Sequence, residues 1–262
     1  MTRFSLIAIA LAAVGCKQAA DSDALTAELA VDSTNVNQAE STVLASAVDG
    51  SEAGAGVGLV GAATPQGVAD WITAHAAARY SPAGCATVTE SGLTVKLVFD
   101  DCTGPRGLRQ LTGEMDLTVS AGSGGAIDIA AQATNLEIGQ ATMSVDSNAV
   151  YTASGATKSL TVTTQGSGTG PLGNTIQHDG QYTATWDASC VSLEGAWSTD
   201  VGQTQRSTTA SVMRCADQCP TGTVTRDTFN GRTIDITFDG TDVAKWTSST
   251  GRSGTFTLPC GL

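Results

Sequence analysis

The residues best suited to chemistry in this chain are its seven cysteines and two histidines. Six cysteines lie between residues 85 and 260, and they show no C-x-x-C spacing. The chain also has no H-E-x-x-H string and no paired histidines, so no metal site is expected. An even number of cysteines in an exported chain predicts three disulfides formed in an oxidising compartment. The six are Cys85, Cys102, Cys190, Cys215, Cys219 and Cys260.

The pairing of these cysteines is predicted from hairpins. A turn centred between Gly202 and Gln203 places Cys190 opposite Cys215, within disulfide reach across two strands. Cys85 and Cys102 bracket a turn at Ser91-Gly92, with an offset that a bulge can absorb. Cys219 then pairs with Cys260. The alternative joins Cys215 to Cys219 and Cys190 to Cys260.

No catalytic group stands out among the remaining polar residues. His75 falls on the apolar face of a predicted helix, where a packed, hydrogen-bonded core histidine is expected. His178 precedes Asp179-Gly180, a turn signal, and is expected at a solvated hairpin tip. The G-x-S-x-G string of a nucleophile elbow is absent, and the carboxylate pairs Asp100-Asp101 and Asp239/Asp242 are typical of turns. We therefore expect no catalytic residue, no metal, no cofactor and no enzyme activity.

The seventh cysteine, Cys16, follows a short apolar run from Leu6 to Val14 that has a basic residue before it. The residues Ala13-Val14-Gly15-Cys16 resemble the lipobox of bacterial lipoproteins. The resemblance implies a signal peptide over 1–15, acylation (palmitate) of Cys16 and anchoring to a membrane. Lys17 is not the aspartate associated with inner-membrane retention, which implies the outer membrane. The alternative is an ordinary secretory signal with a chance cysteine.

Residues 16–64 are predicted to form a disordered acidic tether. From Lys17 to Thr64 the chain has seven acidic residues, one basic residue and no aromatic residue. A G-x-G-x-x-G string at Gly56–Gly61 lies in this segment without a preceding strand, so it is interpreted as a spacer. The formal charge of the whole chain is -12, which disfavours nucleic acid and anionic lipid as partners.

Residues 65–262 are predicted to form one disulfide-stapled β-domain preceded by a short helix. Thr64-Pro65 is a helix start, and Val68, Trp71 and Ile72 follow at helical spacing. From Cys85 onward the apolar period becomes two, as in antiparallel sheets with one wet side. The apolar sets are Val95/Leu97/Phe99, Met115/Leu117/Val119, Ile127/Ile129, Leu160/Val162, Tyr182/Ala184/Trp186, Ile234/Ile236/Phe238 and Phe256/Leu258.

Turn signals separate these runs, at Ser91-Gly92, Asp179-Gly180, Asn230-Gly231 and Asp239-Gly240. Short turns make consecutive strands neighbours in space. The predicted fold class is all-β: a large antiparallel up-and-down meander of about a dozen strands, curled or barrel-like, with one N-terminal helix packed on it. Trp186 is expected in the core, whereas Trp197 and Trp246 are open to either core packing or a ligand surface.

The leading functional hypothesis is a non-enzymatic outer-membrane lipoprotein that acts as a binding or structural module of the envelope. Its expected partners are the membrane, through the lipid anchor, and an unknown protein or small hydrophobic ligand, with no nucleic acid. One alternative is a carrier of a lipid or other hydrophobic ligand, with a pocket behind Trp71 and Ile72. Another is an envelope hydrolase, which would need His75 or His178 beside an acid in a cleft.

Overall fold

The computed structural model describes residues 64–103, 110–170, 172–187, 189–202, 204–215, 218–228 and 231–257. The predicted signal peptide, the lipidation site Cys16 and the acidic tether up to residue 63 lie outside these ranges, as does Cys260.

The predicted helix is present as α2, Pro65–His75, followed by a short 3-10 turn, η1, Ala77–Arg79. The Gly67 N–H donates to the Thr64 hydroxyl at 3.1 Å, and Pro65 occupies the first turn, where its missing N–H costs nothing. Val68 and Ile72 are fully buried. The helix start predicted at Thr64-Pro65 is confirmed.

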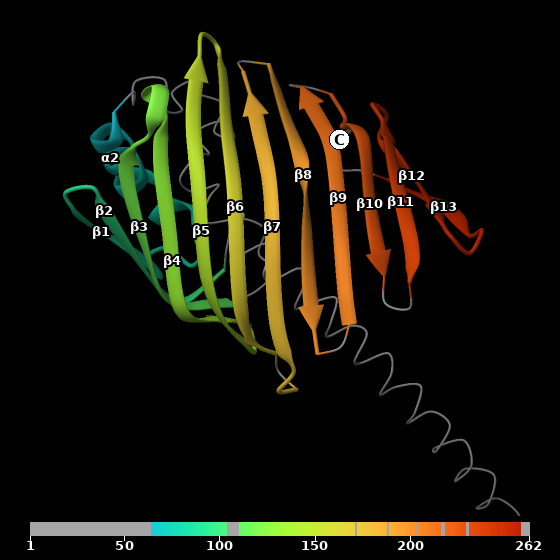
Figure 1. The fold of residues 1–262 in the computed structure, drawn as a ribbon, viewed down its shortest axis with the longest axis horizontal. Helices are drawn as coiled ribbons and strands as arrows, with labels where there is room; N and C mark the ends of the chain where they lie inside the picture. Colours follow the sequence, from blue (N-terminus) through green and yellow to red (C-terminus); the bar gives the residue numbers. More distant parts are fainter. Residues whose placement is uncertain are drawn as a thin grey trace, which may run out of the picture.

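Thirteen strands form one antiparallel sheet in which every strand pairs only with its neighbours in the chain. The sheet is strongly curled but does not close, so β1 and β13 are its two edges (Figure 1). The predicted up-and-down meander is confirmed, as a curled open sheet. The strands are β1 Ala86–Ser91, β2 Thr94–Thr103, β3 Gln110–Ala121, β4 Ile127–Ile138, β5 Ala141–Ser154, β6 Thr157–Thr169, β7 Thr175–Trp186, β8 Cys190–Val201, β9 Thr204–Cys215, β10 Thr221–Thr228, β11 Arg232–Asp239, β12 Val243–Ser248 and β13 Ser253–Thr257.

The turns at Ser91-Gly92 and Asp239-Gly240 are where the sequence predicts them, and Gly231 has the positive φ of a hairpin turn while Asn230 lies outside the described residues. The predicted turn at Asp179-Gly180 is wrong, because both residues lie inside β7. Gly180 serves close packing instead of a turn. A Cβ built there would lie 3.0 Å from the Thr164 Cγ2 and 3.0 Å from the Trp197 Cβ.

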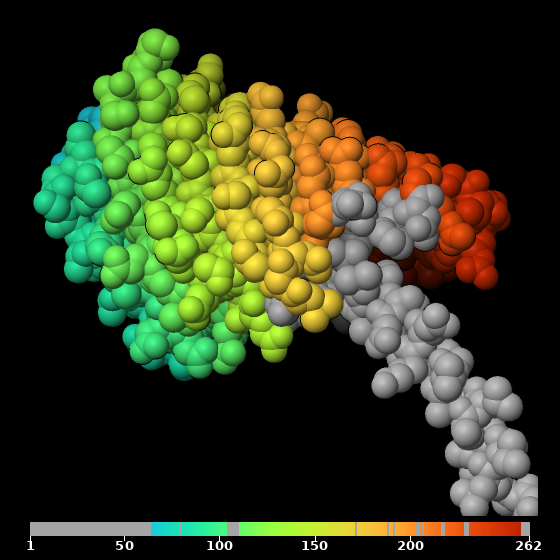
Figure 2. Space-filling view, turned by 60° about the horizontal axis from the view of Figure 1, so that its bottom comes forward, coloured from blue at the N-terminus to red at the C-terminus, as the bar shows by residue number. Residues whose placement is uncertain are grey.

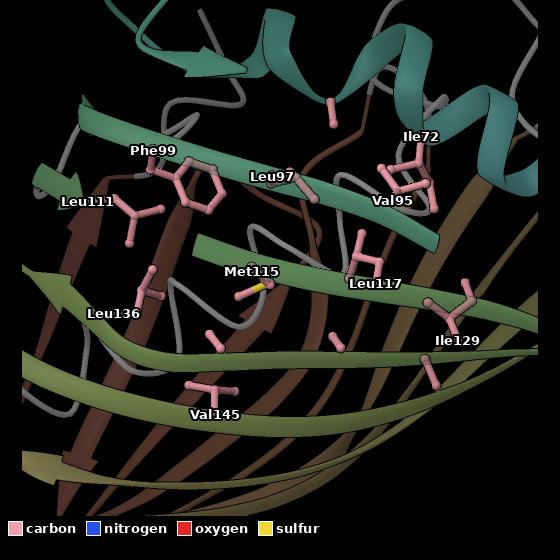
Figure 3. Packing of buried hydrophobic residues seen from close by; sticks show 14 of the residues in the cluster. Ile72, Val95, Leu97, Phe99, Leu111, Met115, Leu117, Ile129, Leu136 and Val145 are labelled. Atoms are coloured by element: carbon pink, nitrogen blue, oxygen red, sulfur yellow. The ribbon is translucent and has the colours of Figure 1, made fainter. Parts of the chain in front are cut away.

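Side chains alternate between two faces along each strand. We call the face that contains Leu97, Leu117 and Ile129 the inner face, and the opposite face the outer face. The inner face is the concave side, and α2 packs on it at the end formed by β1, β2 and β3 (Figures 1 and 3). The strands form one continuous surface that narrows toward β13 (Figure 2).

The core is not spread evenly over the inner face. Apolar side chains of β2 to β7 are buried there, and Figure 3 shows labelled ones from β2 to β5 on the side of the sheet that faces α2. In β11 the predicted apolar set Ile234, Ile236 and Phe238 is only half-buried, and Phe256 of β13 is 42% exposed. The alternation predicted from the sequence is present in the described strands, but most of the buried apolar residues lie in α2 and in β1 to β7.

Two of the predicted disulfides are confirmed. Cys190 faces Cys215 across β8 and β9 and is bonded to it, and Cys85 is bonded to Cys102. The sequence predicts that Cys85 and Cys102 are offset from direct cross-strand positions. A register shift in β2 between Phe99 and Cys102 provides this offset. Cys219 is disulfide-bonded as well, and its predicted partner, Cys260, lies outside the described residues.

Candidate ligand-binding face

Four polar side chains are almost completely buried in the described part of the chain, and all four lie together on the inner face. They are Ser147 of β5, Thr164 of β6, His178 of β7 and Thr199 of β8. The strand register explains the grouping, because Ser147 is opposite Thr164 and His178 is opposite Thr199. We call these four residues the inner polar cluster.

Hydrogen bonds compensate for the burial of this cluster. The Ser147 hydroxyl donates to the Thr164 hydroxyl oxygen at 2.8 Å, and the His178 Nδ1 lies 2.9 Å from the Thr199 hydroxyl oxygen. A buried polar group without such a partner costs about 1–3 kcal/mol. The pairs therefore let hydroxyl and imidazole groups sit in an otherwise apolar surface.

Both histidine predictions are wrong, in opposite directions. His178, expected at a solvated tip, is 2% exposed, because Asp179-Gly180 is inside β7 and not in a turn. His75, expected in the core, is exposed. Its ring stacks on Trp71 with centroids 4.8 Å apart, and its Nδ1 donates to the Trp71 carbonyl oxygen at 2.8 Å. The buried stripe of α2 runs through Val68, Ile72 and Ala76, so His75 falls beside it.

The acidic side chains are separated from His178 by the sheet itself. Every Asp and Glu within β3 to β11 occupies an outer-face register position. They are Glu114, Asp116, Asp128, Glu137, Asp146, Asp179, Glu194, Asp200, Asp227, Asp235 and Asp239. The imidazole of His178 and these carboxylates therefore do not converge, as acid–base chemistry would require.

An open groove of about 600 Å³ crosses β4 to β7. Asp146 and Asp179 line it, with Gln132, Gln165 and Gln177, and these exposed side chains belong to the outer face. His178 also borders the groove, but its ring is bonded to Thr199 on the inner side. The hydrolase hypothesis gains no support from this arrangement. No group of His, Cys, Asp and Glu residues suited to a metal ion occurs within the described ranges.

The inner face continues beyond the polar cluster as a half-exposed apolar surface. One row runs from Tyr182 of β7 through Val224 and Ile236 to Trp246 of β12, each residue half-buried. Trp246 lies over Gly254 of β13, where a Cβ would come within 2.7 Å of the indole nitrogen. We call the inner-face residues of β8 to β13 the C-terminal inner face.

The three tryptophans of the sheet therefore differ in setting. Trp186 is buried, with its ring centroid 6.2 Å from that of Tyr151, which confirms its predicted place in the core. Trp197 and Trp246 are only half-buried. These two present part of their rings on the C-terminal inner face.

Arginines occupy the same face. Arg226 of β10 lies opposite Thr208, which lies opposite Trp197, and its neighbour on the other side is Ile234 of β11. Arg206, Arg214 and Arg232 are also at inner-face positions by the register. Arg206 and Arg232 are two residues along their strands from the row of Arg226, whereas Arg214 is six residues from it. Arg214 donates from Nε to the Gln218 carbonyl oxygen at 3.3 Å. Sequence reasoning missed this grouping because the arginines are far apart in the chain. Their alternation with Asp227 and Asp235 was the available signal.

The carrier hypothesis expects a pocket behind Trp71 and Ile72, but the groove described above crosses β4 to β7. Ile72 has no exposed surface, and neither does Val68, so α2 packs directly on β1 to β3. The main contacts of α2 are with β1, β2 and β3, so the helix lies over one end of the inner face.

No family model, curated protein or solved structure matches this chain. Its function is therefore inferred from its own residues. None of the helices in the described ranges has the length and apolar character needed to cross a membrane.

Proposed function

We propose that this protein is a non-enzymatic lipoprotein of the bacterial outer membrane whose C-terminal inner face binds a ligand or partner in the envelope. The lipobox-like residues Ala13-Val14-Gly15-Cys16 support export and acylation. The disulfides Cys85–Cys102 and Cys190–Cys215 are in keeping with an oxidising compartment.

One observation carries the binding role. The sheet has an open half in which Ile236, Phe238 and Trp246 are half-buried and Phe256 is 42% exposed, on the same side as the sealed core. A grouped apolar surface of this kind is typical of an interaction site. The outer face, by contrast, carries the carboxylates, which keep a protein soluble.

A carrier of a hydrophobic ligand is the second candidate. It is favoured by the concave shape of the sheet and by the row of half-buried aliphatic and aromatic residues from Tyr182 to Trp246. In this version the ligand lies on the open half of the sheet and not beneath α2. A carrier releases its ligand, whereas a structural module keeps its partner.

The anchor is tested by metabolic labelling with a fatty-acid analogue in intact cells that express the wild type or Cys16→Ala. The proposal predicts label on the wild type, none on Cys16→Ala, and the wild type in the outer-membrane fraction. Unlabelled wild-type protein, or a mass that retains residues 1–15, would contradict it. Cys190→Ala is a suitable control, because it removes a cysteine without removing the lipobox.

A further inference from the structure

We infer that the C-terminal inner face takes an anionic amphiphile, specifically an acidic phospholipid, with its phosphate at Arg226 and its acyl chains over the neighbouring apolar residues. This inference rests on the proposed binding function and names its ligand. The two signs of charge are divided between the two faces of the sheet.

The outer face of β10 and β11 satisfies its own carboxylates. Asp227 accepts hydrogen bonds from the Ser207 and Thr233 hydroxyls, the second at 3.0 Å. Asp235 accepts from the Thr225 hydroxyl at 2.7 Å, and Asp239 from Lys245 at 2.8 Å. None of these carboxylates is bonded to an arginine within the described ranges.

Arg226 stands next to Asp227 in the chain but on the other face, because successive side chains of a strand alternate. Its side chain is half-buried, and no hydrogen bond or ion pair joins it to another described residue. Desolvating a guanidinium without a partner is unfavourable, so such a group gains when an anion binds. The planar guanidinium group can donate two parallel hydrogen bonds to a phosphate group.

Arg226 has apolar and aromatic residues near it on the inner face, besides its polar cross-strand neighbour Thr208. Ile234 is its direct cross-strand neighbour, and Val224 precedes it on the same face of β10. Trp197 lies two strands away in the same row, roughly 10 Å between backbones. A free inorganic anion would leave these side chains in water, whereas an acyl chain would cover them.

Net charge alone predicts the opposite result. A chain with a formal charge of -12 is expected to repel anionic lipid. However, salt screens charges over about 8–10 Å, and the sheet places its acids on the outer face. Four arginines, and no acid of β3 to β11, are at inner-face register positions. Arg206 and Arg232 are each two residues along their strands from the row of Arg226, whereas Arg214 is six residues from it. The local sign at the proposed site is therefore positive.

The test is isothermal titration of the chain carrying Cys16→Ala, which removes the anchor, with two probes used as monomers in solution. The probes are dihexanoyl-phosphatidylglycerol, which is anionic, and dihexanoyl-phosphatidylcholine, which is zwitterionic. We expect phosphatidylglycerol to bind about tenfold or more tightly than phosphatidylcholine, as a charge-assisted hydrogen bond implies. Arg226→Gln should abolish this preference, and Arg226→Lys should keep part of it.

The matched control is Arg252→Gln, which removes the same charge from the exposed turn between β12 and β13 and should leave the preference unchanged. Thermal unfolding of each variant checks that it is folded. If Arg226→Gln does not fold, Arg226→Lys still tests the site.

The outcomes separate this inference from the proposed function. If both lipids bind equally and Arg226→Gln does not change their binding, the anion site is overturned. The proposed function then stands with a hydrophobic ligand. If inorganic phosphate binds as tightly as phosphatidylglycerol, the acyl chains contribute nothing, and the claim that the ligand is an amphiphile is overturned. A further variant replaces the seven acidic residues between residues 17 and 63 by their neutral amides. If phosphatidylglycerol binds this variant but not the chain with its acids, the chain's own carboxylates occupy the arginines, which also overturns the inference.

Discussion

His178 and Thr199 face each other on the inner side of β7 and β8, and the imidazole Nδ1 lies 2.9 Å from the threonine hydroxyl oxygen. Neither side chain is more than 2% exposed. A cross-strand polar pair of this kind lies where the closed core gives way to the half-exposed apolar surface of β8 to β13. It fixes the position of an imidazole beside the proposed ligand surface.

The first prediction concerns that hydrogen bond. Thr199→Val keeps the shape of the side chain but leaves the His178 Nδ1 without its hydroxyl partner. Loss of a buried hydrogen bond should lower the free energy of unfolding by about 1–3 kcal/mol. Urea denaturation measures this change. Thr209→Val, at an exposed outer position of β9, should change it by less than about 0.5 kcal/mol. Equal effects of the two substitutions would show that the pair has no structural role.

The second prediction uses two glycines of the same face. A Cβ at Gly195 would lie 2.5 Å from the Tyr182 Cα, whereas one at Gly166 would meet the Met143 Cε at an ordinary 3.4 Å. Gly195→Ala should therefore destabilise the sheet by about 1–3 kcal/mol through overpacking. Gly166→Ala should be tolerated, since it adds a side chain to a strand glycine without a clash. Thermal unfolding compares them, and the reverse order would mean that the packing between β7 and β8 is misplaced.

The third prediction is a pH dependence at the turn after β11. Hydrogen bonds from Lys245 and Thr241 hold the pKa of the Asp239 carboxyl well below its usual range. Because the folded pKa is lower than the unfolded one, the contact stabilises the fold above about pH 4 and is lost as pH falls through the folded pKa.

Carbon NMR of the Asp239 carboxyl follows this titration directly. Lys245→Gln should move the pKa of Asp239 upward toward its ordinary value. Lys96→Gln breaks a different exposed ion pair, with Glu114 at 2.5 Å, and should leave Asp239 unchanged. An Asp239 carboxyl that titrates normally in the wild type would contradict the contact.

Much of the fold is predictable because its rules are local. Alternation of Val95, Leu97 and Phe99 predicts a strand with one buried face, and short turns make consecutive strands neighbours. The same local rule predicts that Cys190 faces Cys215, since register follows from the position of one turn.

The local rules fail where packing decides the role of a residue. Asp179-Gly180 has the composition of a turn, yet Gly180 is a glycine because Thr164 and Trp197 leave no room for a Cβ. The prediction that His178 lies at a hairpin tip depends on that turn, so it fails for the same reason. Half-burial of Ile236 is not predictable either, because it depends on how far α2 extends across the sheet.

The arginine grouping needs long-range information. Arg206, Arg226 and Arg232 are seen to lie near one another only when the registers of β9, β10 and β11 are known. Their alternation with outer-face acids is visible in the sequence, but the face to which each belongs is set by the register of the sheet.

The central claim is that the inner face of β11, and not its outer face, meets a ligand or partner in the cell. Neighbouring residues test it most directly, because Ile236 is on the inner face and Thr237 is on the outer face of the same strand. A photoreactive amino acid at each position, activated in intact cells, reports what lies against each face. The account predicts crosslinked adducts from position 236 and few or none from position 237. Equal crosslinking at both positions, or crosslinking from position 237 alone, would contradict it.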